Sequence, residues 1–205
     1  MNVVLLCFFW ISWCVIHSIL IDVSVVGFIK KHAIGLTRYY RLLYNAFSLA
    51  TFIPLIIFTK MAEGQVVVSW EGYAIPIRAL LLVVSFLLFK GGAQQYDLKS
   101  FLGLKQLQTG KGQLLMSETE SFTENGIFAI TRHPWYLGSL LFIWTMLPNY
   151  PLPVFLAVCI MSIYLVVGTM LEERKIVAQY GDSYRRYQQR VSMFFPWKWL
   201  VRLLR

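Results

Sequence analysis

A chain of 205 residues that is 58% hydrophobic and only 14% charged differs from a soluble domain, in which about a quarter of the residues carry charge. The net charge of +9 would by itself fit nucleic-acid binding, but no nucleic-acid motif accompanies it. The basic residues lie between apolar runs, where the cytoplasmic loops of membrane proteins collect Lys and Arg. The composition therefore predicts one all-α integral membrane domain over residues 1–205, with the lipid bilayer as a partner and no nucleic acid.

Five apolar segments approach or reach the roughly 20 residues that a helix needs to cross a bilayer once. They are residues 3–21, 42–59, 74–89, 135–147 and 154–171. The first three predict a three-helix scaffold over residues 1–92. The fourth covers only about 20 Å at about 1.5 Å per residue, so we expect its start within the membrane edge or in a thinned bilayer. The last two, joined at Pro148 to Pro151, predict a tight helical hairpin over residues 135–171.

The first apolar segment has neither a basic region before it nor a small-residue cleavage site after it, so we expect a retained span rather than a signal peptide. His17, near the end of that segment, is expected to make a polar contact inside the bundle or to belong to a pocket. The cysteines fall inside apolar runs, which predicts buried small side chains and neither disulfides nor a metal site. They are Cys7, Cys14 and Cys159.

Polar stretches separate the apolar segments. Residues 22–41 are expected to form a basic loop, and residues 66–70 a short strand or an interfacial piece. Gly91 and Gly92 are expected to mark the end of the third span. The longest polar stretch, residues 93–134, is expected to be a cytoplasmic loop that contributes to a lid over the site.

The last polar stretch, residues 172–205, predicts a helix over 174–190 with a break at Gly181, followed by an interfacial anchor from Pro196 onward. Lys and Arg number four in residues 22–41, four in 93–134, eight from residue 172 onward, and one in 60–73. Because cytoplasmic segments carry the excess of Lys and Arg, five spans place the N-terminus outside and the C-terminus in the cytoplasm.

A cluster of chemically capable residues precedes the fourth apolar segment. Pro134 suits the first turn of a helix, where its missing N–H costs nothing. Arg132 and His133 then lie at a helix N-terminus, which favours an anionic ligand group. Tyr136 adds an aromatic face and a hydroxyl. The alternative is an interfacial belt of Arg, His, Trp and Tyr side chains.

Glu172 and Glu173 follow the fifth apolar segment directly. Acids at the edge of a membrane span are costly unless paired, and Arg132 and Arg174 are available partners. The alternative is a solvated helix start. Three tyrosines recur on one helical face farther along, where they line either a site or a surface that lies on the membrane. They are Tyr180, Tyr184 and Tyr187.

Taken together, Arg132-His133-Pro134-x-Tyr136, then Glu172-Glu173, then Tyr180-Gly181-x-x-Tyr184-x-x-Tyr187 resemble the isoprenylcysteine carboxyl methyltransferase-like superfamily. That superfamily includes phospholipid N-methyltransferases, methanethiol S-methyltransferases and, more distantly, sterol reductases. The resemblance covers about residues 120–196. His17-Ser18 and the run from Tyr39 to Asn45 resemble its bacterial NnrU-like or methanethiol-methylating branch, which implies a bacterial or archaeal inner membrane.

The resemblance implies an integral-membrane enzyme that uses S-adenosylmethionine, bound between residues 120–136 and a tail, residues 172–205, that closes over the cofactor. The residues implied to hold the cofactor are Gly126, His133, Pro134, Tyr136, Tyr184 and Tyr187. Arg132 and Glu173 or Glu172 would be catalytic, next to the acceptor. The acceptor is a lipophilic or small thiol, carboxylate or amine, and either Glu is able to take a proton from a thiol or an amine. The sequence fixes neither which Glu matters more nor the oligomeric state.

Two other classes of function remain as alternatives. One is a non-catalytic membrane protein that binds haem or assists assembly, using histidines that are scattered and form no axial-ligand motif. These histidines are His17, His32 and His133. The other is a membrane reductase of the sterol type that uses the nicotinamide cofactor NADPH, which cofactor selectivity would distinguish from a methyltransferase.

Overall fold

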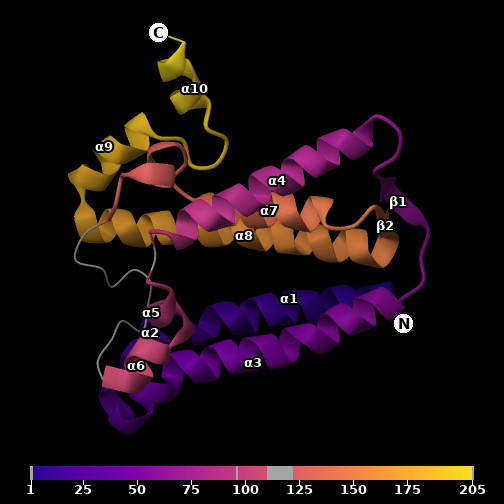
Figure 1. The fold of residues 1–205 in the computed structure, drawn as a ribbon. Coiled ribbons are helices and arrows are strands. Elements are labelled where there is room, and N and C mark those ends of the chain that lie inside the picture. Colours follow the sequence, from indigo (N-terminus) through magenta and orange to yellow (C-terminus); the bar gives the residue numbers. More distant parts are fainter. Residues whose placement is uncertain (1, 96, 110–121, 205) are drawn as a thin grey trace. The chain divides into compact units, whose positions relative to one another are not determined.

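The structure, a computed structural model, describes residues 2–95, 97–109 and 122–204 (Figure 1). The chain is mainly helical, as its apolar runs predicted. The first half contains α1 (Val3–Leu20), α2 (Val23–His32), α3 (Ile34–Met61), β1 (Val66–Ser69), α4 (Ala74–Ala93), α5 (Leu98–Leu102) and α6 (Leu104–Thr109). The second half contains the 3-10 helix η1 (Gly126–Ala129), α7 (Pro134–Thr145), β2 (Asn149–Pro151), α8 (Leu152–Tyr180), α9 (Asp182–Arg190) and α10 (Trp197–Leu203).

Four helices in the described part of the chain are long and apolar enough to cross a membrane, namely α1, α3, α4 and α8. The chain is therefore a membrane protein by the length and composition of its helices. The expected fifth span corresponds to α7, which has 12 residues. At about 1.5 Å per residue α7 is roughly 18 Å long, which is shorter than the hydrocarbon core of about 30 Å.

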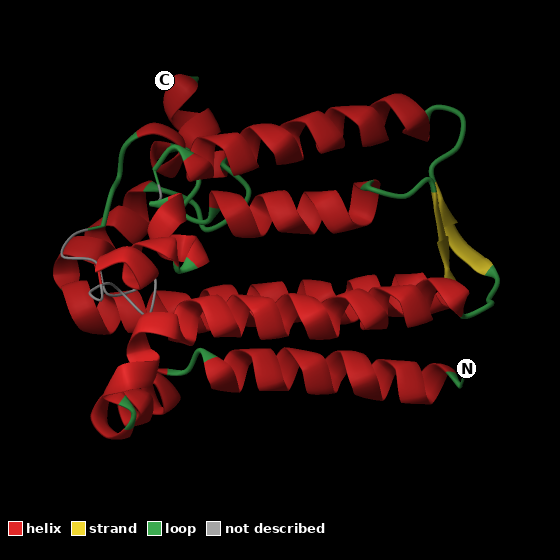
Figure 2. Ribbon diagram, turned by 60° about the horizontal axis from the view of Figure 1, so that its bottom comes forward, coloured by secondary structure: helices red, strands yellow, loops and turns green. Residues whose placement is uncertain are grey.

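The chain forms two compact units, which are described separately below. Unit 1 comprises the described residues of 1–67, 97–120 and 151–161, and unit 2 comprises those of 68–96, 121–150 and 162–205. Helix α8 begins in unit 1 and continues in unit 2. The strands β1 and β2 pair in a two-stranded sheet, drawn in yellow in Figure 2. Of the two alternatives left open for residues 66–70, a short strand or an interfacial piece, the structure has the strand.

Unit 1 packs α1 against α3 around an apolar core that contains Leu6, Trp10 and Leu55. The indole of Trp10 donates to the Thr59 hydroxyl at 2.9 Å. His17 makes the polar contact expected of it, because its ring nitrogens lie 2.7 Å from the Tyr44 hydroxyl, on Nε2, and 3.0 Å from the Ser48 hydroxyl, on Nδ1. It also lines a cavity of about 50 Å³ together with Trp13, Ile16, Phe47, Ser48 and Thr51.

Two element boundaries differ from the sequence-based expectation. Residues 22–41 are not a loop but form α2 and the start of α3, because Asp22 caps α2 by accepting from the Ser24 N–H at 2.9 Å. Helix α4 continues through Gly91 and Gly92 to Ala93. The expected lid over residues 93–134 is described only in part, since residues 110–121 lie outside the described residues.

The tail differs in where its helix begins. Helix α8 does not stop at the end of its apolar stretch but carries Glu172 and Glu173 on to Tyr180. The predicted break at Gly181 is confirmed, and its φ of +56° is a backbone conformation that favours glycine. Helix α9 then begins at Asp182.

In unit 2, α4 and α7 pack closely where both helices carry small residues. Gly92 leaves the space that the Trp135 indole fills, and the Trp135 Nε1 donates to the Phe89 carbonyl at 3.1 Å. Gly138 lies against Phe89, and its carbonyl accepts from the Ser85 hydroxyl at 2.8 Å. A side chain at Gly92 would collide with α7. The glycine therefore marks this close contact between the helices and not the end of α4.

Three side chains satisfy the last three carbonyls of α7 and the carbonyl of its C-cap Met146, which no helical N–H reaches. Trp70 donates to the Trp144 carbonyl at 3.0 Å, and Arg78 donates to the carbonyls of Thr145 at 2.7 Å and Met146 at 3.3 Å. Tyr150, which is fully buried, donates to the Ile143 carbonyl at 3.0 Å. A short helix whose end is satisfied in this way needs no water at that end.

Candidate active site

The Arg132-His133 segment is fixed by main-chain bonds to the strand-like segment that follows α9. Thr131 and Ser192 form a parallel bridge. The Arg132 N–H donates to the Ser192 carbonyl at 3.0 Å, and the His133 N–H donates to the Met193 carbonyl at 3.2 Å. Helix α7 starts immediately afterwards, with Pro134 in its first turn as predicted. These bonds bring two segments about 60 residues apart in the sequence to one end of unit 2.

Glu173 is the centre of the site. Arg132 binds its carboxylate through two parallel bonds, Nε to Oε1 at 2.6 Å and Nη2 to Oε2 at 2.9 Å. Three further donors reach the same carboxylate, namely His133 Nε2 at 3.0 Å, the Tyr184 hydroxyl at 3.1 Å and Gln188 Nε2 at 2.9 Å. Two of the predicted partners, Arg132 and Glu173, are thus an ion pair, as the cost of an unpaired acid at a membrane edge suggested.

The ion pair is shielded from solvent. The side chains of Arg132 and His133 are 8% and 5% exposed, and that of Glu173 is 12% exposed. The remaining Arg132 nitrogen, Nη1, donates to the carbonyls of Gln188 and Val191. The anion that the Arg132 guanidinium binds in this structure is therefore the chain's own Glu173 carboxylate.

The tyrosine face packs inward rather than on the membrane surface. Tyr184 and Tyr187 are 3% and 2% exposed and form a core with Val191 and Phe122. The Tyr187 hydroxyl donates to the Phe128 carbonyl at 2.7 Å. Burial, together with the negative charge of Glu173, raises the pKa of Tyr184 well above its ordinary value. Tyr184 is consequently a hydrogen-bond donor to Glu173 and not a base.

The other predicted site residues lie around this cluster or outside it. Tyr136 meets the His133 ring edge-on, with centroids 5.7 Å apart. Gly126 begins η1 with a φ of +60°, which explains the glycine at this turn. Glu172 lies about 100° around α8 from Glu173. It makes no hydrogen bond or ion pair to any residue that the structure describes.

Two residues of the cluster were not among those predicted from the sequence. Gln188 donates to Glu173 through its side chain, and its carbonyl accepts from the Lys198 ammonium at 2.7 Å. A signal for Gln188 was present, because it lies one helical turn after Tyr184 on the same face of α9. Lys198 had no such signal, since its contact depends on how the chain turns between α9 and α10.

The sequence model of the phospholipid methyltransferase family matches residues 79–183. The chain belongs to the phospholipid methyltransferase family. The match includes Arg132, His133 and Glu173, and ends just before Tyr184. This confirms the superfamily and the methanethiol-methylating branch that the motifs resembled.

Curated relatives of this phospholipid methyltransferase family member carry one name. The chain is 40% identical to methanethiol S-methyltransferase 1 of Bradyrhizobium diazoefficiens over 72 residues, which are 35% of the chain and 25% of that relative. It is 31% identical over 127 residues, 62% of the chain, to methanethiol S-methyltransferase of Pseudomonas deceptionensis, of which it covers 43%. It is 25% identical over 202 residues, 88% of the chain, to that of Crocosphaera subtropica, of which it covers 76%. No solved structure matches significantly.

Proposed function

We propose that the protein is an S-adenosylmethionine-dependent methyltransferase that methylates a small thiol at the cytoplasmic face of a bacterial inner membrane. One observation carries the proposal. Within the residues that match the family, the fold gathers Arg132, His133 and Glu173 into one shielded hydrogen-bonded cluster at the start of α7. The chain spans 25% and 43% of the length of the first two curated relatives it matches. The activity of those proteins is therefore only proposed for this chain.

The chain's donors and rings suit the proposed cofactor. S-adenosylmethionine, when bound, supplies a methyl group on a sulfonium, which is already a good leaving group. The N-terminus of α7 has no side-chain cap and suits a carboxylate, because the partial positive charge of the helix is concentrated there. The half-buried ring of Tyr136 offers an aromatic face to a cation. Gly126, His133 and Pro134 complete the proposed binding segment, and Tyr184 and Tyr187 support it from the core.

The two acids receive different proposed roles. Glu173 accepts hydrogen bonds from four side chains, which stabilise its charged form and make it a poor proton acceptor. We therefore assign Glu173 the task of fixing Arg132 and His133 in place. Glu172 has no such donors, and is the proposed proton acceptor for a thiol. A proton acceptor suits a thiol substrate because the thiolate, not the thiol, is the nucleophile.

The acceptor proposal rests on the names of the relatives, all of which are methanethiol S-methyltransferases. The family name alone would equally suggest a phospholipid amine. Membership in a methyltransferase family argues against the haem-binding and NADPH-reductase alternatives.

We further propose five crossings, with α7 and α8 as a hairpin, the N-terminus outside and the C-terminus in the cytoplasm. Two contacts support an antiparallel hairpin. Trp144 donates to the Ser162 hydroxyl at 2.9 Å near one end of α7, and Tyr136 lies against Gly168 near the other. As the residue number falls along α7 it rises along α8, which is the pattern of antiparallel neighbours.

The test is calorimetry of S-adenosylmethionine and S-adenosylhomocysteine with the detergent-purified full chain, followed by detection of S-methyl product from methanethiol. We expect both ligands to bind. Glu173→Gln and Arg132→Ala should reduce turnover about 100-fold or more, because each leaves a shielded charge without its partner. Arg132→Lys keeps the charge but loses the two parallel bonds, and should lose most of the activity as well.

Glu172→Gln tests the role proposed for the neighbouring acid. It should lower turnover of the thiol while leaving the affinity for S-adenosylhomocysteine unchanged. Full activity in both Glu173→Gln and Arg132→Ala would contradict the site. Absence of binding in monodisperse wild-type protein would contradict the cofactor and return attention to haem or NADPH. Methylation of a phospholipid amine but not of methanethiol would correct the acceptor alone.

A further inference from the structure

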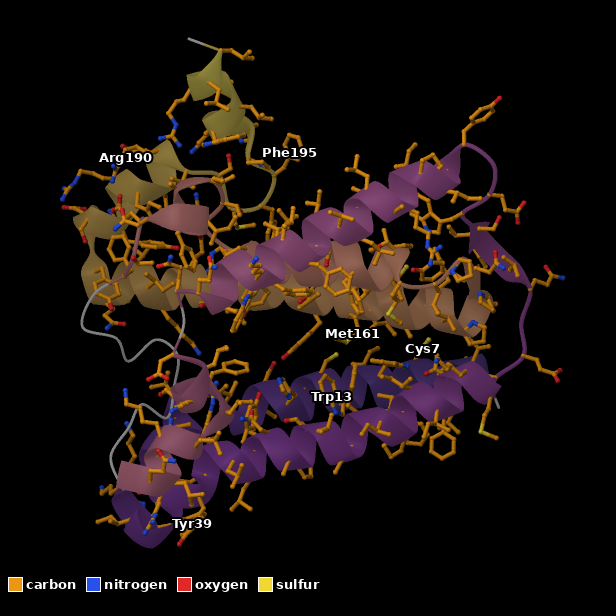
Figure 3. The ribbon with its side chains drawn as sticks, viewed as in Figure 1. Cys7, Trp13, Tyr39, Met161, Arg190 and Phe195 are labelled. Atoms are coloured by element: carbon orange, nitrogen blue, oxygen red, sulfur yellow. The ribbon has the colours of Figure 1, made fainter. Side chains whose placement is uncertain are left out.

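Helix α10 carries an apolar face that the described residues of unit 2 leave uncovered. Its side chains at spacings of three and four residues lie on one side of the helix. They are Trp197, Leu200, Val201 and the C-cap Leu204, and all are exposed, Trp197 by 54% and Leu204 by 88%. Phe195, just before the helix and labelled in Figure 3, is exposed by 67%. A soluble protein rarely exposes so many adjoining large apolar side chains.

The cations of α10 point the other way, onto the protein. The Lys198 ammonium donates to the Gln188 carbonyl at 2.7 Å, and the Arg202 Nη2 donates to the Ala129 carbonyl at 3.2 Å. The Lys198 N–H also donates to the Ser192 hydroxyl at 3.2 Å. The two cations thus bond to the protein on the side of α10 away from its apolar face, Lys198 half-buried and Arg202 exposed.

The placement of α10 fits the edge of a bilayer. Figure 1 shows α10, in yellow, running across the direction of α4 and the unit 2 part of α8, at the end of the unit where α9 lies. Because α4 and α8 are candidate membrane spans, a helix that runs across their direction lies along the membrane plane. Interfacial helices lie in this way, with the apolar face sunk among the upper acyl chains and Trp at headgroup level.

The two side-chain hydrogen bonds from the α10 cations end on segments that hold the site. Gln188, which accepts from Lys198, donates through its side chain to Glu173. Ala129, which accepts from Arg202, ends η1, two residues before the bridge that fixes Arg132 and His133. A displacement of α10 would therefore pull on Gln188, which donates to Glu173, and on Ala129, which lies three residues before Arg132.

We propose that α10 lies in the membrane interface with Trp197, Leu200, Val201 and Leu204 in lipid, and that Lys198 and Arg202 make the cofactor site depend on this contact. The occupant of the apolar face is the bilayer in which the spans of the same chain lie. The lipid contact stands without the proposed function, whereas the dependence of cofactor affinity on that contact rests on it.

The first experiment reads lipid contact directly. Wild-type protein and Trp197→Phe are reconstituted in phosphatidylcholine vesicles, and the difference between their emission spectra isolates Trp197. Bromine placed on the acyl chains near the headgroup should quench this difference signal more strongly than bromine near the chain ends. Quenching by aqueous iodide but not by brominated lipid would overturn the proposal in favour of a water-exposed helix. Insensitivity to both quenchers, with cross-linked dimers, would overturn it in favour of a second copy.

The second experiment reads the connection to the site. Lys198→Met and Arg202→Met keep the aliphatic stem of each side chain and remove its charge. Each should weaken the binding of S-adenosylhomocysteine in vesicles about tenfold, which corresponds to about 1.4 kcal/mol, close to the usual worth of one charge-assisted hydrogen bond. Leu200→Ser, on the apolar face, should weaken it in vesicles. Leu203→Ser makes the same chemical change on an exposed residue about 110° from the centre of that face, and should leave the affinity unchanged.

The outcomes separate the two proposals. If wild-type protein binds no S-adenosylhomocysteine, the proposed function fails, while Trp197 quenching still decides the lipid contact. If wild-type protein binds and Leu200→Ser and Leu203→Ser bind equally well, the connection between lipid contact and site is wrong. Circular dichroism and monodispersity of each variant identify any that fail to fold, in which case Arg202→Gln and Val201→Ser replace them.

Discussion

At the scale of single residues, Glu173 organises the hydrogen bonds of the candidate site. A shielded carboxylate is costly, and the cost is offset only when its lone pairs are satisfied. Arg132, His133, Tyr184 and Gln188 supply the donors from α9 and from the segment before α7. Removing the charge leaves Arg132 shielded from water without an anion. Glu173 is therefore expected to be indispensable even though its saturated carboxylate is a poor base.

Tyr184 gives a prediction about pH. Its pKa is raised above the ordinary value of 10.0 by burial and by the charge of Glu173. Below pH 10 the hydroxyl is protonated in both the folded and the unfolded chain, so its stabilising contribution is fully present. As the pH rises above 10, only the unfolded chain loses the proton, and the free energy of unfolding falls.

We expect Tyr184→Phe to lower the free energy of unfolding by about 1.5–3 kcal/mol at pH 8, the usual worth of a hydrogen bond to a charged group. The difference from wild type should narrow above pH 10, because the variant has no hydroxyl to ionise. Thermal unfolding in detergent between pH 8 and 11 measures both effects. Tyr180→Phe, at the end of α8 and half-buried against the same core, is the control. A difference that stays constant across this range would contradict the assignment.

At the scale of elements, α7 is fixed at both ends. Its last three carbonyls and that of its C-cap Met146 accept from Trp70, Arg78 and Tyr150, and its first turn follows the bridge between Thr131 and Ser192. Between the two ends, Gly92 and Gly138 allow α4 to approach closely. A short helix held in this way places the His133-Pro134 end at a defined depth, which a longer helix free to slide would not do.

Two glycines in helices give opposite predictions for the same substitution. In Gly92→Ala the new methyl group would collide with the Trp135 indole, whose ring cannot move without losing its bond to Phe89. We expect it to destabilise the protein by about 1–3 kcal/mol. In Gly27→Ala the methyl group meets nothing within 4 Å, and alanine favours a helix by about 0.8–1 kcal/mol. Melting temperatures in one detergent should shift in opposite directions, and equal shifts would contradict the α4–α7 packing.

At the scale of the whole molecule, the number of crossings determines the sides of the membrane on which the two ends lie. Four helices satisfy the length and composition of a span, while α7 has 12 residues. If α7 crosses with the help of its satisfied C-terminal carbonyls, the ends lie on opposite sides. If it only dips into the bilayer, they lie on the same side.

We expect opposite sides, because Lys and Arg number eight from residue 172 onward and none before the first span. A fluorescent protein that folds only in the cytoplasm should fluoresce when fused after Arg205. An epitope placed before Met1 should be cleaved by protease in intact spheroplasts. Protection of both tags, with fluorescence retained, would contradict five crossings and favour four.

The sequence by itself determined the class of protein and the residues of the site. Apolar runs identified α1, α3, α4 and α8 as candidate spans because the hydration cost of a segment depends on its composition alone, and the family motifs pointed to Arg132, His133 and the pair Glu172 and Glu173 as candidate site residues. Only the tertiary structure decided what those residues bind. In the structure Arg132 pairs with Glu173, Tyr184 and Tyr187 are buried, and Gln188 and Lys198 join the cluster. Hydrogen bonds between distant segments depend on packing, which local sequence patterns do not encode.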